Sequence, residues 1–203
     1  MKFYGPFDQS IFAVASYRTI NDNDAMEYKQ SGSDIDTSKK ILKVNHAGEF
    51  GAVNIYKAQV LVSNFFRREF TPMLERFQED EERHLEIFWT EIQRRDGVKC
   101  KSFWLCGLGG FSMGFVSALL GKRGVMACTW AVESVVTEHL EKQLTYLEMI
   151  GDYEAIETVK AILEDEEHHR DVAFADEGMN VLFGPFRFLV RMFTEGVIRF
   201  GMR

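Results

Sequence analysis

Two groups of acidic and histidine side chains recur in this sequence with nearly the same spacing. In each group a glutamate in an apolar stretch is followed, 32 or 33 residues later, by a Glu-x-x-His motif. The two groups are Glu49 with Glu81 and His84, and Glu133 with Glu166 and His169. Residues i and i+3 lie on one face of a helix, and about 32 residues let a chain run out, turn and return to the same level. The spacing therefore predicts two helical hairpins whose donor groups meet at mid-length.

Four carboxylates and two imidazoles that converge inside a bundle need a compensating positive charge. Without a cation, desolvation and mutual repulsion would prevent the carboxylates from remaining ionised. One glutamate from each of two helices and Glu-x-x-His from each of two others is the ligand set of ferritin-like di-iron and di-manganese bundles. Oxygen and nitrogen donors without thiolates favour iron or manganese. The pattern predicts a centre of two divalent metal ions, either iron or manganese.

The assignment of individual ligands leaves alternatives open at this point. The second motif can also be read as Asp165-x-x-His168, and only the similar spacings favour Glu166 with His169. Runs of consecutive acids such as residues 78–83 and 164–167 are typical of a solvated helix face. Glu133 is more distinctive, because the surrounding alanines and valines predict burial and a buried glutamate usually has a partner.

The composition indicates which elements must position these groups. The chain has 203 residues, of which 46% are apolar and only three are proline, so we expect a single all-α domain. Residues 1–37 show weak periodicity and are treated as an N-terminal appendage to a ferritin-like domain over residues 38–203. Ser38 and Thr71 are the expected N-caps of the first two helices. The expected helices are 38–66, 71–96, 124–150 and 153–177.

Two further segments suggest contact with a lipid surface. Residues 102–121 are uncharged and contain five glycines; a single crossing of a membrane would separate the two hairpins, so we expect an interfacial or tunnel-lining crossover. Gly110-x-x-x-Gly114 is a candidate close helix contact. Residues 185–203 predict a basic amphipathic helix with arginines four residues apart, which either lies on an anionic membrane surface or packs on the bundle.

Charge and cysteine content exclude several classes of protein. The net charge of −7 disfavours nucleic-acid partners. Three cysteines without a Cys-x-x-Cys pair argue against a disulfide framework and a thiolate zinc site. The N-terminal segment is acidic, unlike an Arg-rich transit peptide. We therefore expect a cytoplasmic protein, of a bacterium, peripheral on the inner face of the cell membrane.

Four stretches of the sequence resemble one enzyme family. They are residues 44–56 (VNHAGEFGAVNIY), 81–85 (EERHL), 119–133 (LLGK leading to MACTWAVE) and 165–173 (DEEHHRDVA). These strings strongly resemble the four bundle helices of the demethoxyubiquinone hydroxylase family, and the resemblance covers about residues 40–200. It implies a ferritin-like peripheral membrane monooxygenase of ubiquinone biosynthesis, which hydroxylates the ring of a polyprenylated demethoxyquinone with O₂.

The resemblance also implies roles for individual residues. Carried over by position, the six metal ligands are those of the two groups described above, with Glu81 and Glu166 bridging two iron ions. His139 matches a family histidine expected near the site, but Leu140 stands where the family commonly has a tyrosine. Electrons would come from an external reductant, either NADH or an electron-transfer protein. A homo-oligomer or a biosynthetic complex is a further expectation.

Two other functions remain open from the sequence. A different ferritin-like oxidase or peroxidase would hold the same metals without an organic substrate. A non-catalytic helical bundle that binds lipid or a partner protein would use the acids only as surface charge. Metal content would distinguish a hydroxylase from a non-catalytic bundle. A bound quinone would distinguish a hydroxylase from another ferritin-like oxidase or peroxidase.

Overall fold

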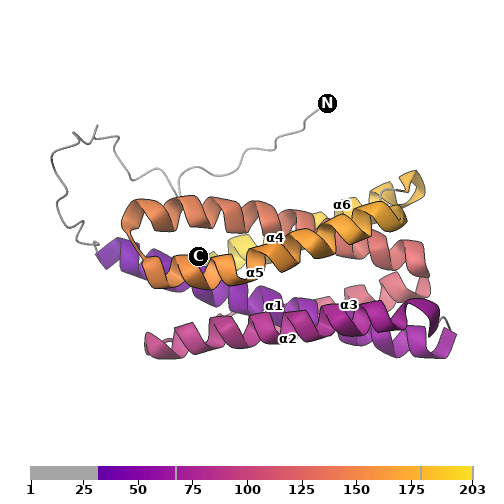
Figure 1. Cartoon of the computed structure of the whole chain (residues 1–203), viewed down its shortest axis with the longest axis horizontal. Helices are drawn as coiled ribbons and strands as arrows, with labels where there is room; N and C mark the ends of the chain where they lie inside the picture. The colour runs from indigo at the N-terminus through magenta and orange to yellow at the C-terminus, as the bar shows by residue number, and fades with distance from the viewer. Residues whose placement is uncertain (1–31, 67, 179, 203) are drawn as a thin grey trace.

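The computed structural model describes residues 32–66, 68–178 and 180–202, and over these ranges the chain is helical without a strand (Figure 1). Six α-helices are joined by short helical turns. The α-helices are α1 (Gly32–Phe66), α2 (Thr71–Arg94), α3 (Phe103–Leu119), α4 (Lys122–Ile150), α5 (Tyr153–Ala173) and α6 (Gly184–Met202). The turns are η2 (Arg68–Phe70), η3 (Phe174–Gly178) and η4 (Val181–Phe183). The expectation of an all-α bundle is confirmed.

Two antiparallel hairpins, α1–α2 and α4–α5, run side by side along the long axis of the molecule (Figure 1). Apolar side chains fill the bundle on both sides of its middle. One cluster surrounds Ile41, Phe88 and Leu147 near one end, and another surrounds Val62, Leu74 and Met126 toward the other. The glutamates and histidines singled out by the sequence fall between these two apolar clusters.

Local sequence explains the junction between α4 and α5. α4 ends where Gly151 adopts a left-handed conformation with φ 69°, which glycine tolerates best. The Asp152 carboxylate then accepts a hydrogen bond from the backbone N–H of Ala155 and caps α5. α5 gives way to a wider turn after Ala173, so its regular part is shorter than the predicted helix over 153–177.

The predicted N-cap at Ser38 is wrong. α1 already begins at Gly32, and Ser38 is buried inside the helix, where its hydroxyl donates a hydrogen bond to Asp152. Arg95 joins the same network with two hydrogen bonds to Asp152, of 2.7 and 2.8 Å. The serine therefore ties the two hairpins together. The expected appendage over residues 1–37 falls largely outside the described residues, apart from the first turns of α1.

α3 packs on α1 through glycines. A Cβ atom at Gly110 would lie 2.2 Å from the Gly51 carbonyl oxygen, and one at Gly114 would lie 2.2 Å from the Ile55 carbonyl oxygen. Only glycine permits this backbone approach, so the predicted close contact is present. Within the described part of the chain, none of the helices has the length and apolar content needed to cross a membrane.

α6 packs on the bundle, which is one of the two arrangements expected of it. Its arginines Arg187 and Arg191 lie over the ring of Trp130, at 5.6 and 5.9 Å. Val190 is its buried residue, whereas Phe188, Leu189, Met192 and Phe200 are exposed. The outward face of α6 is therefore apolar, while two of the arginines expected to meet an anionic surface contact α4.

Candidate metal centre

The fold brings the six predicted donor residues together at the middle of the bundle, and each of them is at most 4% exposed. Two sets of side chains each offer ligand atoms within 4.8 Å of one another. One set is Glu49, Glu81, His84 and Glu166, and the other is Glu81, Glu133, Glu166 and His169. Glu81 and Glu166 belong to both sets. This arrangement offers two adjacent cation sites with two shared carboxylates.

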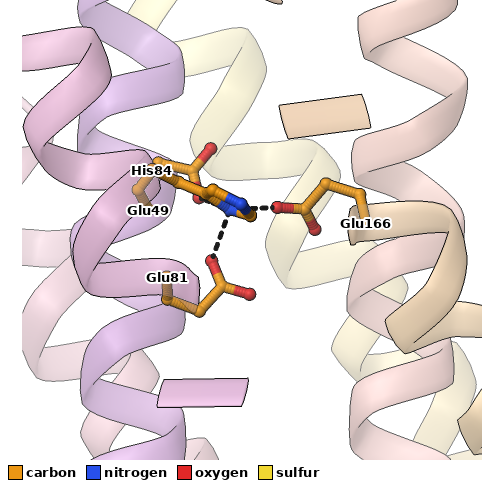
Figure 2. A group of neighbouring side chains, drawn as sticks. All are labelled: Glu49, Glu81, His84 and Glu166. Atoms are coloured by element: carbon orange, nitrogen blue, oxygen red, sulfur yellow. Dashed lines mark ion pairs between the residues drawn. The ribbon is translucent and has the colours of Figure 1, made fainter. Parts of the chain in front are cut away.

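Each of the four bundle helices contributes to the cluster. α1 supplies Glu49, and α4 supplies Glu133. α2 and α5 each supply a glutamate and a histidine one turn apart, so that both side chains point the same way. Figure 2 shows Glu166 reaching His84 from the opposite hairpin, with Glu49 and Glu81 on the same side as His84.

The inward-facing atoms are close together, yet several of them make no aligned hydrogen bond. His84 Nδ1 lies 2.9 Å from Glu166 Oε1 and 3.7 Å from Glu81 Oε2, and His169 Nδ1 lies 3.2 Å from Glu81 Oε1. Both Nδ1 atoms, both Glu81 oxygens and Glu166 Oε1 are buried without a hydrogen-bond partner among the described residues. Because such atoms are costly to bury alone, this donor set fits cations placed between the helices.

The pKa values in the cluster show how strongly it requires positive charge. Burial raises the pKa of Glu49 and Glu133 well above the usual range, and the neighbouring carboxylates add to the increase. Burial opposes charge on His84 too, but Glu166 and Glu81 outweigh it and raise the His84 pKa to about 12. For Glu81, the two histidines overcome the effect of burial and lower the pKa to about 2. Divalent cations between the helices would supply the positive charge that four buried carboxylates require.

A second layer of polar groups surrounds the donors. The outward nitrogen of each histidine faces an aspartate from the other hairpin: His84 Nε2 lies 3.1 Å from Asp165, and His169 Nε2 lies 3.3 Å from Asp80. This leaves each Nδ1 free to face the cluster, the arrangement usual for histidine ligands of metals. Tyr56 donates a hydrogen bond of 3.1 Å to Glu133.

The geometry also distinguishes the two frames of the second motif. Glu166 and His169 lie in the cluster, Asp165 lies outside it against His84, and His168 is exposed. The outer residues Tyr56 and Asp80 were not anticipated as parts of the site, and Asp165 was considered only as an alternative metal ligand. Tyr56 follows Glu49 by seven residues, which is two helical turns, so the helical repeat could have placed it on the same face.

A pocket leads from the cluster toward α3 and α6. Its inner end is formed by the carboxylates Glu49, Glu81, Glu133 and Glu166. Its walls are mostly apolar and come from α1, α3, α4 and α6, including Ile55, Met113, Val136, Phe193 and Val197. Such a pocket suits an apolar molecule with one reactive end at the cluster.

His139 lies in the pocket wall and belongs to neither set of candidate ligands. Its Nε2 atom lies 3.3 Å from Glu195 Oε2 on α6. Leu140, the next residue, is 2% exposed and also lines the pocket. The structure thus places the predicted near-site histidine beside the space a substrate would occupy, away from the metal-facing atoms.

Comparison with known proteins supplies independent evidence. The family model described as ubiquinone biosynthesis protein COQ7 matches residues 36–201. A protein of Dictyostelium discoideum, named mitochondrial NADPH-dependent 3-demethoxyubiquinone 3-hydroxylase, is 32% identical over 197 residues, spanning 91% of this chain and 90% of that protein. A Rhodospirillum rubrum protein named 3-demethoxyubiquinol 3-hydroxylase is 32% identical over 139 residues, spanning 68% of this chain and 64% of that protein. The chain therefore belongs to the family of the ubiquinone biosynthesis protein COQ7.

Proposed function

We propose that this protein is a di-iron monooxygenase that hydroxylates the ring of a polyprenylated demethoxyquinone with O₂. The observation that carries the proposal is the direct opening of an apolar pocket onto four buried carboxylates. The names of the relatives from Dictyostelium discoideum and Rhodospirillum rubrum support the same reaction. The apolar pocket favours an organic substrate over simple oxidation of iron, because a ferrous ion needs no apolar chamber.

In this proposal the six buried donors would hold two iron ions; Glu81 and Glu166 belong to both sets of candidate ligands. The bound metals supply the redox chemistry with O₂. The protein excludes water from the reacting end, since the bundle is closed by apolar clusters on both sides of the centre. Asp165 and Asp80 fix the orientation of the two imidazoles, and Tyr56 fixes one oxygen of Glu133.

The substrate's tail would enter from a lipid surface. The exposed side of α3 carries Trp104 and Leu108, which are 74% and 71% exposed, and α6 exposes Phe188 and Leu189. Both helices also line the pocket. Apolar patches of this kind mark membrane or protein contacts. We infer that α3 and α6 rest on the membrane and that the isoprenoid tail passes between them.

Vesicle flotation tests this contact. Glu substitutions at Leu108 and Phe188 should abolish binding to phosphatidylcholine vesicles, because they place charge in the apolar face. Neutralising Arg187 and Arg191, which contact Trp130 and not the outer face, should change binding little. If neutralising the arginines weakened vesicle binding more than the glutamate substitutions did, the basic side of α6 would be the membrane contact instead.

The reductant is external in this account. The Dictyostelium discoideum relative is named NADPH-dependent, which supports a reduced nicotinamide nucleotide as the electron source, with an electron-transfer protein as the alternative. Anaerobic mixing of the iron-loaded protein with NADPH, NADH or a reduced ferredoxin, in the presence of quinone, would rank them by the rate of reduction.

The reaction itself is tested by loading the full chain with iron without oxygen and then adding O₂, reductant and a short-chain demethoxyquinone. Hydroxylated quinone is the expected product. Glu133→Ala and His169→Ala should remove it. Glu138→Ala, at a half-exposed residue of α4 that pairs with Lys142, should not. Product formation by the first two variants would reject the proposed centre.

A further inference from the structure

The outer layer of the centre is crossed between the two hairpins. Asp80 adjoins Glu81 in α2, yet its carboxylate lies 3.3 Å from His169 of α5. Asp165 adjoins Glu166 in α5, yet its carboxylate lies 3.1 Å from His84 of α2. Each hairpin therefore orients the histidine of the other, and any shift of one hairpin moves both imidazoles.

A single guanidinium joins the two aspartates. Arg83 Nη2 lies 3.0 Å from Asp80 Oδ1 and 2.7 Å from Asp165 Oδ2. Both carboxylates are about one-third exposed, so each could otherwise turn toward water. The two negative carboxylates repel one another. The positive guanidinium between them offsets this repulsion and links the two hairpins.

The second hairpin carries a different residue at the position equivalent to Arg83. The duplicated motif places His168 at the position of Arg83, two residues after the shared glutamate. His168 is exposed and makes its ring contacts with Phe77 and His169, at 6.5 and 6.4 Å between ring centroids. Arg83 thus contacts the aspartates that face both imidazoles. The six donor residues are repeated in the two hairpins, but this arginine is not.

We propose that Arg83 is a positioning residue that couples the two metal half-sites by holding Asp80 and Asp165 together. The inference rests on the proposed function, since it concerns how two metals are held. An isolated ion pair on a surface contributes little, but this guanidinium acts on two carboxylates that each face a buried imidazole. Loss of the bridge should therefore loosen both histidines at once.

Metal binding by the full chain tests the coupling. Co²⁺ is titrated into apo protein without oxygen, with calorimetry for affinity and the visible spectrum for ligand geometry. Arg83→Ala should weaken both bound ions by about tenfold, at the lower end of the range for groups that orient metal ligands. Asp80→Asn and Asp165→Asn should each weaken chiefly one ion, and His168→Ala, the matched control, should bind as the wild type does.

A readout on the imidazoles separates positioning from general destabilisation. In the Co²⁺-loaded wild type, both histidine Nε2–H protons should give slowly exchanging, paramagnetically shifted NMR signals. Arg83→Ala should speed the exchange of both signals with the helical content unchanged, and Arg83→Lys should restore part of the protection. Arg83→Ala that binds two ions with wild-type affinity, or loses only one, would overturn the coupling. Wild-type protein that binds no pair of ions would overturn the proposed function itself.

Discussion

The α1–α2 hairpin and the α4–α5 hairpin contribute the same set of donors to the centre, yet they are held in place by different means. α1 meets α3 at a backbone-to-backbone contact through Gly51 and Gly110. α4 is covered by α6, whose buried side chain is Val190. The first hairpin thus sits against a closely packed neighbour, and the second lies beneath a helix with a mainly exposed surface.

At two positions in the outer layer the first hairpin carries a polar or charged residue where the second carries a different one. Tyr56, seven residues after Glu49, donates to Glu133 of the other hairpin, whereas Leu140 occupies the equivalent position seven residues after Glu133. Arg83 likewise has His168 as its counterpart. The comparison indicates that repeated donor positions can be supported by an unrepeated outer layer, supplied here mostly by α1 and α2.

The largest expected effect is a difference in metal content between variants of a carboxylate that belongs to both candidate sites and one that belongs to a single site. Glu81 offers ligand atoms to both candidate sites, and Glu49 offers them to one. Glu81→Gln should remove both metal ions, whereas Glu49→Gln should leave one of the two. Metal analysis after anaerobic iron loading and gel filtration measures this difference. Equal metal content in the two variants would show that the two carboxylates are not used differently.

An alanine substitution at the glycine contact between α1 and α3 should destabilise the fold more than one on α6, which covers the second hairpin. Gly110→Ala places a methyl group 2.2 Å from a backbone oxygen of α1, so we expect a loss of about 1–3 kcal/mol in the free energy of unfolding. Gly196→Ala on α6 has no atom within 4 Å of the new methyl and should be neutral or slightly stabilising. Chemical denaturation measures both, and a neutral Gly110→Ala would contradict the close packing.

Acid should weaken the polar tie between the hairpins. Burial favours the neutral acid, but hydrogen bonds from Arg95 and Ser38 outweigh it and hold the pKa of Asp152 below its usual value of 3.8. This group's stabilisation is therefore complete above about pH 4 and is lost as pH falls through the lowered pKa. Asp152→Asn should cost about 2 kcal/mol at neutral pH and should flatten the acid limb of stability against pH. An unchanged acid limb would exclude Asp152 as its source.

The smallest effect concerns the tyrosine that crosses between hairpins. Tyr56→Phe leaves Glu133 Oε1 without its hydrogen bond, so we expect the metal on the His169 side to bind several-fold more weakly, at about 1 kcal/mol. Leu140→Met, at the equivalent position of the other hairpin, should leave metal binding unchanged. A Tyr56→Phe variant with wild-type affinity for both ions would remove the asymmetry between the hairpins.

Much of this arrangement follows from periodicity alone. The spacings from Glu49 to Glu81 and from Glu133 to Glu166 predict a common level in the bundle, because helical rise converts residue number directly into distance. Gly151 predicts the end of α4 because the required left-handed conformation suits glycine. Helix length and helix ends depend on residues within one helical hairpin, so the sequence of that hairpin is enough to predict them.

Individual side-chain contacts across the bundle were predicted only in part. Ser38 reads as a helix cap in isolation, but its hydroxyl serves Asp152, 114 residues away. Asp80 and Asp165 read as solvated acids, although each faces a buried histidine of the other hairpin. For α6, the sequence left open whether the helix lies on a membrane or packs on the bundle, and Arg187 and Arg191 contact Trp130. In each case the deciding partner lies far away in sequence.

The most direct test of the account is Mössbauer spectroscopy of the full chain loaded anaerobically with ⁵⁷Fe²⁺ and then exposed to O₂. Six donors with two shared carboxylates predict two irons per chain that are magnetically coupled, with the coupling lost in Glu81→Gln. One iron per chain, or two uncoupled irons in the wild type, would contradict a centre shared between the two hairpins.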